Sequence, residues 1–261
     1  TVNITVDTAP PTIALTEPVE TAFKGGDTVS FGYTLTGNNI TGLSLTDFVA
    51  TGLTLTGLTV TTSTATEITG TVTGTVNNGY AGSTVSVHIG NGTITDAMGN
   101  TNADGSDTNN GWSRPADAIR PTAALSMTDT NIAAGEVGII HITLSESVGS
   151  NALQLTDFLL NGVSGAATAA LGYSLTGSGA NWVLTYTPPV ATSTSSTITL
   201  SADAFSDAAG NNNADNNSIS FQVDSVVPTA TITVADNTLG AGSTTQIQIT
   251  LSEACPTFGL G

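Results

Sequence analysis

The sequence predicts an all-β protein built from tandem β-sandwich domains of about seven strands each, and three observations lead to this fold class. First, the corner motif Asp-x-x-x-Pro occurs at residues 7–11, 117–121 and 224–228, so its copies lie 110 and 107 residues apart. Second, runs of alternating apolar and polar residues follow each copy, in a chain rich in Thr, Val, Ser, Gly and Asn. Third, apolar residues do not recur at helical spacing, so helices are not expected.

Other short motifs keep the same step of about 110 residues. The pairs are 47–48 with 157–158 (Asp-Phe), 96–100 with 207–211 (Asp-Ala-x-Gly-Asn), 102–104 with 213–215 (Asn-Ala-Asp), and 144–146 with 251–253 (Leu-Ser-Glu). Self-similarity at a fixed period is the mark of an array of similar domains. We therefore expect each Asp-x-x-x-Pro corner to join one domain to the next.

The elements of the first repeat follow from its alternation. Residues 1–7 align without a gap on 218–224, so we expect them to be the last strand of a preceding domain. The first domain is predicted over residues 8–120. Its strand-like runs are 12–16, 28–35, 43–50, 53–61, 66–73 and 83–90. Its closing segment, 111–117, contains Pro115, which cannot donate to a ladder, so we expect an irregular or edge strand with Trp112 packing over the domain end.

The second domain is predicted over residues 121–227. Its strand-like runs are 122–127, 136–144, 153–160, 168–175, 181–187, 196–201 and 218–224. Seven short strands in about 107 residues match the size and rhythm of an immunoglobulin-like sandwich. Residues 228–261 are predicted to begin a further, incomplete domain, with strands at 229–234 and 244–251. We expect the native chain to continue in both directions.

Composition excludes several classes of partner. Three basic residues stand against 20 acidic ones, giving a net charge of -17, so nucleic acid and anionic membrane surfaces are poor partners. The sequence contains no apolar stretch long enough to span a bilayer, so membrane insertion is not expected. The single cysteine, Cys255, excludes an intrachain disulfide.

Several segments resemble a known family. They are 228–236 (Pro-Thr-Ala-Thr-Ile-Thr-Val-Ala-Asp), 239–254 with its Leu-Ser-Glu, and 207–211 (Asp-Ala-Ala-Gly-Asn) before the terminal Val-Asp of 223–224. Together they resemble the bacterial Ig-like domains that are repeated in large surface adhesins. The resemblance implies an extracellular, cell-surface location, neighbouring repeats of the same chain as partners, and Ca²⁺ at the linkers that stiffens the array. The first repeat departs from the pattern, because Thr36-Gly37-Asn38 replaces Ser-Glu.

The function expected from this resemblance is non-enzymatic. It is a spacer or adhesive segment of a large bacterial surface protein, and the alternative is a subunit of an extracellular filament, sheath or surface-layer lattice that contacts like subunits. A glycan-binding module would need an exposed aromatic cluster, which the sequence does not show. His88 and His141 occupy non-equivalent positions in different repeats and have no Cys partner, so we predict no catalytic residues.

The acidic residues predict where a metal ion would bind. In an antiparallel sandwich, the loops after the second, fourth and sixth strands share the end at which the chain enters. In the second repeat this end gathers Asp117, Glu146, Asp207, Asn211 and Asp215, and the preceding domain can add Glu17 or Glu20. The equivalent positions of the other repeats are Asp7, Asp96, Asn100, Asp104, Asp224 and Glu253.

Such a gathering of carboxylates leaves two interpretations open. Uncompensated carboxylates repel one another or take up protons, and Ca²⁺ accepts six to eight oxygen ligands in flexible geometry, so a structural Ca²⁺ is the first. The second is turn chemistry alone, because Asp-x-Ala-Gly-Asn is also a good turn whose Asp caps backbone amides while Gly or Asn takes a positive φ.

Overall fold

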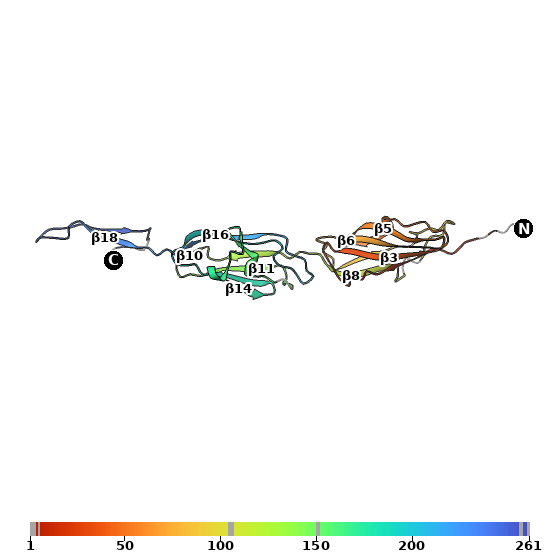
Figure 1. Cartoon of the computed structure of the whole chain (residues 1–261), viewed down its shortest axis with the longest axis horizontal. Helices are drawn as coiled ribbons and strands as arrows, with labels where there is room; N and C mark the ends of the chain where they lie inside the picture. Colours follow the sequence, from red (N-terminus) through yellow and green to blue (C-terminus); the bar gives the residue numbers. More distant parts are fainter. Residues whose placement is uncertain (1–3, 5, 104–106, 150–151, 256–257, 260–261) are drawn as a thin grey trace. The chain divides into compact units, whose positions relative to one another are not determined.

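The computed structural model is all-β, which confirms the predicted fold class (Figure 1). It describes every residue except 1–3, 5, 104–106, 150–151, 256–257 and 260–261. The helical elements in the described part of the chain are short 3-10 turns. None of them is long and apolar enough to cross a membrane. The predicted strand at 1–7 lies partly outside the described residues, and Ile4, Val6 and Asp7 are not in a strand.

The chain forms two compact units that cut across the predicted domain limits. The first comprises residues 1–123, 144–153 and 202–215, and the second comprises 124–143, 154–201 and 216–261. The first unit therefore holds the first sandwich together with two loops that follow it in the sequence. The domain limits given above stay predictions.

The first sandwich has two sheets (Figure 1). One has the order β1 (Thr12–Thr16), β3 (Thr28–Thr36), β6 (Glu67–Val76) and β5 (Leu53–Ser63), with antiparallel neighbours. The other has the order β2 (Phe23–Lys24), β8 (Gly111–Asp117), β7 (Thr84–His88) and β4 (Val49–Thr51). In this second sheet the short β2 runs parallel to β8, and the other neighbours are antiparallel.

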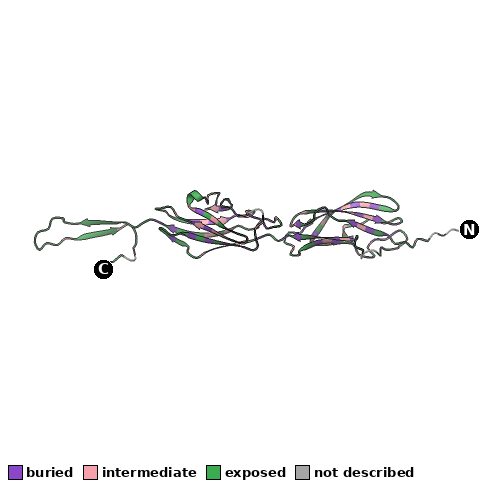
Figure 2. Cartoon of the chain, turned by 90° about the horizontal axis from the view of Figure 1, so that it is seen from below, coloured by how far each residue is buried: buried purple, intermediate pink, exposed green. Residues whose placement is uncertain are grey.

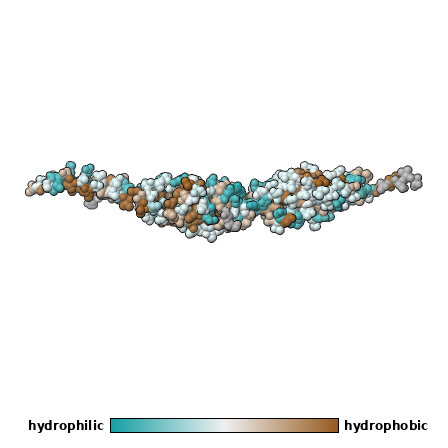
Figure 3. Space-filling model, in the orientation of Figure 1, coloured by the Kyte–Doolittle hydropathy of each residue, from teal (hydrophilic) through white to brown (hydrophobic). Residues whose placement is uncertain are grey.

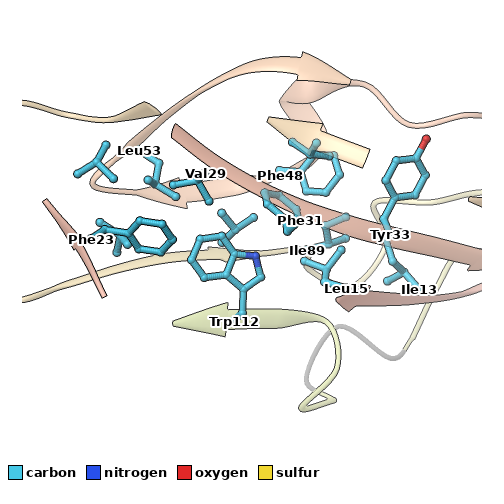
Figure 4. Packing of buried hydrophobic residues seen from close by; sticks show 14 of the residues in the cluster. Ile13, Leu15, Phe23, Val29, Phe31, Tyr33, Phe48, Leu53, Ile89 and Trp112 are labelled. Carbon is cyan, nitrogen blue, oxygen red and sulfur yellow. The ribbon is translucent and has the colours of Figure 1, made fainter. Parts of the chain in front are cut away.

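The core of the first sandwich follows from strict alternation along its strands. In β3 the side chains of Val29, Phe31, Tyr33 and Leu35 are buried, and a serine, a glycine and a threonine lie between them. Phe31 makes an edge-to-face contact with Trp112 at a centroid distance of 5.4 Å (Figure 4). Such contacts add about 0.5–1.5 kcal/mol beyond the area that the rings bury.

The closing strand of the first repeat is regular, and β2 pairs with it only at Ala116 and Asp117, so the irregular alternative is wrong while the edge position expected for Pro115 holds. β8 is a continuous strand that pairs with β7 from Gly111 to Pro115, and Trp112 lies inside the core rather than over the domain end. Pro115 is tolerated because the amide of the next residue, Ala116, donates to Ser83 on the β7 side. Pro115 therefore turns its nitrogen to the other side, where β2 begins to pair only at Ala116.

The second repeat is built in the same way. One sheet has the order β10 (Asn131–Ala133), β17 (Asn217–Asp224), β16 (Ser193–Leu200), β12 (Phe158–Leu160) and β13 (Val163–Ser164). The other has the order β14 (Tyr173–Ser178), β15 (Asn181–Tyr186), β11 (Gly138–Leu144) and β9 (Ala123–Met127). In the second unit, Tyr173 and Tyr186 stack at 4.5 Å and Tyr186 also contacts Phe221 at 5.8 Å.

The Asp-Phe motif marks a 3-10 turn and not the middle of a strand. Leu45–Asp47 and Leu155–Asp157 are single turns, where continuous strands were expected over 43–50 and 153–160. In each turn the Asp carboxylate accepts the amide three residues earlier, from Ser44 at 2.6 Å and from Gln154 at 2.7 Å. A third turn spans Ala169–Leu171, inside the run expected as a strand over 168–175.

The last described strands, β18 (Ala230–Val234) and β19 (Ile247–Leu251), form an antiparallel hairpin. Nearly all of its residues are exposed, whereas the strands of the two sandwiches alternate between buried and exposed positions (Figure 2). Apolar surface therefore lies open on the hairpin (Figure 3), where Ile232 and Ile247 are each 64% exposed.

Candidate functional site

The Asp-x-x-x-Pro corner is an Asx turn in all three copies. In each, the carboxylate Oδ1 of the Asp accepts the backbone amide two residues later. The three bonds are Ala9 to Asp7 at 3.0 Å, Ile119 to Asp117 at 3.1 Å, and Val226 to Asp224 at 3.2 Å. The Asp thus fixes the direction of the chain before the proline, which explains why this pair recurs at the domain step.

The second corner brings three carboxylates together. One oxygen each of Asp117, Glu146 and Asp207 lies within 4.8 Å of the other two. Asp117 ends β8, Glu146 follows β11, and Asp207 lies in the loop before β17, and all three belong to the first compact unit. Asp207 is buried, Glu146 is half-buried and Asp117 is exposed, so the group is open to solvent on one side.

Asn211 holds this group in place. Its amide nitrogen donates to the Asp207 carboxylate at 2.8 Å and to the backbone oxygen of Asp117 at 3.0 Å. Its side-chain oxygen accepts the backbone amide of Gly25 at 3.1 Å. The sequence predicted Asn211 as an oxygen ligand, but in this arrangement its oxygen faces Gly25 and its nitrogen faces the carboxylates. Asn211 is therefore a positioning residue for the cluster.

The basic residues bind around the cluster and not in it. Lys24 donates to the carbonyl of Gly210 at 3.0 Å, and Arg120 donates to the carbonyl of Asn212 at 2.7 Å. The ion pairs among the described residues are Arg120 with Asp203 at 2.8 Å and Arg114 with Glu17 at 2.6 Å.

The expectation that Glu17 or Glu20 adds a carboxylate to the cluster is corrected by these contacts. The Arg114 guanidinium donates to the Glu17 carboxylate at 2.6 Å, and its Nε donates to the backbone oxygen of Glu20 at 3.2 Å. Glu17 and Glu20 are consequently absent from the carboxylate group that the described residues form.

Burial and the closeness of the three carboxylates affect the pKa of Glu146. Burial, followed by the charges of Asp207 and Asp117, raises the pKa of the Glu146 carboxyl above its ordinary value. Like charges that stand close together make each further ionisation harder, so the cluster favours either a proton or an external cation.

The first corner has the same hydrogen bonds from its Asn as the second corner, but the described residues form no group of three carboxylates there. Asn100 donates to the Asp96 carboxylate at 2.8 Å and to the backbone oxygen of Asp7 at 3.1 Å, as Asn211 does at the second corner. This hydrogen bond from Asn100 is the largest cause that lowers the pKa of Asp96. The side-chain amide of Asn38 donates to the Asp7 carboxylate at 3.0 Å. Asp104 lies outside the described residues.

The remaining predicted ligands are not brought into a group. Asp215 is exposed, and its backbone oxygen accepts a bond from Asn213 at 3.2 Å. Asp224 and Glu253 of the third corner are exposed as well. Among the residues that the structure describes, the only group of three or more metal-binding side chains is therefore that of Asp117, Glu146 and Asp207.

Sequence reasoning missed three residues that shape the corners, namely Lys24, Asn38 and Arg120. Lys24 and Arg120 could have been suspected because basic residues are so rare in this chain. The departure of 36–38 from the Ser-Glu pattern marked Asn38 as unusual. The sequence does not show that Asn38 contacts Asp7, because the two residues are 31 positions apart. Gly149 also matters, because a Cβ there would overlap the backbone oxygen of Asp207.

Comparison with protein families identifies the chain. The model of the bacterial Ig-like domain matches residues 117–223 and 224–261, which together make more than half of the sequence. The chain belongs to the bacterial Ig-like domain family. This family match covers the second corner, including Asp117, Glu146 and Asp207. Among curated proteins, no sequence matches the chain.

Solved structures similar to this bacterial Ig-like chain include two described as adhesins. The Escherichia coli adhesin FdeC is 17% identical, with a TM-score of 0.32, over 97% of this chain and 76% of that one. The Yersinia pseudotuberculosis adhesin InvE is 15% identical, with a TM-score of 0.22, over 81% of this chain and 58% of that one. Domains 4–9 of the surface layer protein SbsC are 15% identical, with a TM-score of 0.23, over 87% and 33%. The family assignment rests on the sequence match.

Proposed function

We propose that this chain is a non-enzymatic spacer segment of a large extracellular bacterial surface protein, in which Ca²⁺ stiffens the corner between Ig-like repeats. The family match and the repeated architecture support a structural or adhesive role. The observation that carries the calcium proposal is the convergence of Asp117, Glu146 and Asp207 to within 4.8 Å.

The chemistry of the group suits a hard cation. The three carboxylates come from three separate segments, so one ion bound to all of them would tie the corner to both loops. Three carboxylates offer up to six oxygens, which is enough for the coordination that Ca²⁺ prefers once water is included. The basic side chains are engaged elsewhere, with Glu17, Asp203 and the carbonyl of Gly210, so the charge of the group must be neutralised by a proton or by a cation from solution.

The expected gain in stability can be worked out from the affinity of comparable sites. Extracellular Ca²⁺ modules bind at about 10⁻⁴ to 10⁻³ M. At 10 mM free Ca²⁺, a ligand that binds only the folded chain then stabilises it by about 1.4–2.7 kcal/mol. A gain of that size corresponds to an increase of several degrees in the melting temperature of the part that it stabilises.

The test compares thermal unfolding and solution scattering in 10 mM CaCl₂ and in EDTA. We expect Ca²⁺ to raise the melting temperature and to narrow the distribution of distances along the chain. Glu146→Gln should remove most of the response, because it deletes one ligand charge with little change of shape. Glu67→Gln is the matched control, since Glu67 is an exposed carboxylate outside the group. Equal curves for the unaltered chain with and without Ca²⁺ would reject the proposal.

A further inference from the structure

We infer that residues 17–25, which lead from one sheet of the first sandwich to the other, form a strap that bears tension along the chain and is held by Arg114 and Lys24. The strap connects β1, which pairs with β3, to the short β2, which pairs with β8. Tension that β1 does not transfer to β3 therefore reaches β8 through the strap. The inference rests on the proposed role as a spacer, because a spacer is pulled at its two ends, and it does not depend on an ion.

The geometry of β2 and β8 loads the strap in shear. The two strands are parallel, and Lys24 lies opposite Asp117, the last residue of β8. The end of β2 therefore lies where the chain leaves the first sandwich. A pull on the residues before β1 draws the strap backward, whereas a pull on the residues after β8 draws β8 onward. The contacts between the strap and β8 are consequently loaded together and not opened one after another.

Backbone pairing alone gives the strap a short hold. β2 contains only Phe23 and Lys24, of which Phe23 is buried in the core (Figure 4). In the second repeat the equivalent β10 pairs with β17 over three residues, and the amide of Gln222 donates to the carbonyl of Thr130 at 2.7 Å just before it. The first repeat adds side-chain contacts to this shorter pairing.

Arg114 supplies the first of these contacts from a position that alternation assigns to the core. In β8 it lies between Trp112 and Ala116, which are both buried. Three residues before the corner Asp, where the first repeat has Arg114, the second repeat has the buried Phe221. Charged side chains rarely occupy such positions unless they are paired. The contacts of Arg114, whose side chain is only 22% exposed, account for a charged residue at this place.

These contacts tie β8 to the first half of the strap. Arg114 donates to the Glu17 carboxylate at 2.6 Å and to the backbone oxygen of Glu20 at 3.2 Å. It also donates to the backbone oxygen of Pro18 at 3.5 Å. A guanidinium offers five N–H donors in a fixed plane, so one side chain can hold several points of a segment. The strap is thus fixed to β8 before β2 begins.

Lys24 holds the other end of the strap. Its ammonium group donates to the carbonyl of Gly210 at 3.0 Å. The amide of the next residue, Gly25, donates to the side-chain oxygen of Asn211 at 3.1 Å. Both acceptors lie in the loop at 202–215, which belongs to the same compact unit as the first sandwich. The end of the strap is therefore tied to a loop that follows β8 in the sequence.

The second repeat lacks the residue that makes this contact. Lys24 faces Asp117 across the β2–β8 pair, and Ala133 faces Asp224 across the matching β10–β17 pair, so Ala133 takes the place of Lys24. The methyl group of an alanine cannot donate a hydrogen bond. The first repeat therefore combines a short pairing with two cationic side chains, whereas the second repeat uses a longer pairing.

The experiment pulls the full chain at constant force in optical tweezers, in EDTA, with Cys255→Ser to remove the native thiol. Handles at Thr8→Cys and Thr122→Cys load the first sandwich through the strap. Handles at Thr62→Cys and Thr122→Cys load the same sandwich through β5, so the strap does not lie on the path between them. All three threonines are exposed, so each accepts a handle without disturbing the core.

The variants remove the two cations one at a time and together. Arg114→Met and Lys24→Met delete the charge and the donors but keep an unbranched side chain. Arg114→Lys keeps a charged donor and tests whether part of the effect is restored. Glu67→Gln is the control, because Glu67 is an exposed charged residue of the same sandwich outside the strap.

We expect each Met variant to shorten the lifetime of the folded first sandwich about tenfold when the handles load the strap, the effect of one lost hydrogen bond to a charged group. The double variant should combine the two effects, and Arg114→Lys should recover part of the lifetime. With the handles that bypass the strap, the same variants should change the lifetime far less. Glu67→Gln should change neither lifetime.

Two results would overturn the inference. One is an unchanged lifetime in either Met variant when the strap is loaded. The other is an equal shortening with both pairs of handles, because the bonds would then stabilise the fold without bearing the load. Since the measurement is made in EDTA, a chain that shows no response to Ca²⁺ would reject the calcium proposal and leave these outcomes unaffected. A failed strap says nothing about the response to Ca²⁺, so the two failures can be told apart.

Discussion

Replacing Asn211 with Ala is the sharpest test of how the second corner is held. Asn211 is buried, and its side chain joins three separate segments through Gly25, Asp117 and Asp207. The substitution removes all three bonds at once. It leaves the amide of Gly25, the backbone oxygen of Asp117 and one oxygen of the Asp207 carboxylate without their partner.

The expected cost follows from the kinds of bond that are lost. The two bonds to backbone groups contribute about 1 kcal/mol each, and the bond to the Asp207 carboxylate contributes about 1.5–3 kcal/mol. Asn211→Ala should therefore cost about 4 kcal/mol. Asn100→Ala is the matched control, because Asn100 makes the equivalent bonds to Asp96 and Asp7, and no bond from it to a residue equivalent to Gly25 is seen among the described residues. It should cost about 3 kcal/mol.

The assay is urea unfolding of the full chain, combined with hydrogen exchange at Gly25. Exchange at this amide reports on the bond to Asn211 directly, so it should rise about fivefold in Asn211→Ala and stay unchanged in Asn100→Ala. A loss of less than about 1 kcal/mol in Asn211→Ala, with unchanged exchange at Gly25, would refute the geometry described for this corner.

Three further predictions address the core, the carboxylates and the loop. Phe31→Ala should destabilise the first sandwich by about 3–5 kcal/mol in denaturant unfolding, because Phe31 is fully surrounded by core residues. The pKa of Glu146 is raised in the folded chain, so its contribution to stability in EDTA is complete below its ordinary pKa and is lost as the pH rises through the raised value. Glu146→Gln should therefore flatten the dependence of the melting temperature on pH across that window. Gly149→Ala should weaken Ca²⁺ binding in calorimetry, because the added Cβ overlaps the backbone of Asp207 and displaces its carboxylate.

The parts of the fold that could be predicted from the sequence are those set by local chemistry. Alternation in β3 and β11 gave strands with the expected buried faces, because a period of two leaves few ways to cover the apolar side chains. The Asp-x-x-x-Pro corner was predictable as well, since an Asx turn before a proline depends only on neighbouring residues.

The parts that could not be predicted depend on contacts between distant residues. Pro115 argued against a regular strand, yet β8 is regular because β2 is too short to need a donor at that position. The turn at Leu155–Asp157 was hidden inside an apolar run, because the same residues suit a strand until the Asp157 carboxylate caps the amide of Gln154. Likewise, Asn211 was assigned as an oxygen ligand because sequence does not show which end of a side-chain amide faces a carboxylate.

The placement of the few basic residues ties the fold to the proposed ion. Lys24 and Arg120 both donate to backbone oxygens of the loop at 202–215, at Gly210 and Asn212, and that loop carries Asp207. These cations therefore fix the position of the loop without neutralising the carboxylates that it presents. If the corner were held by side-chain charge alone, a basic residue would be expected among Asp117, Glu146 and Asp207, where its attraction to three anions would be greatest. Lys24 donates to the backbone of this loop, and Arg120 donates to its backbone and pairs with Asp203, so neither neutralises the three carboxylates, which supports the proposal that a cation from solution does so. The melting temperature of Asp207→Asn can be compared with that of the unaltered chain in each buffer. If the two proteins melt at the same temperature in Ca²⁺, and also at the same temperature in EDTA, that proposal is contradicted.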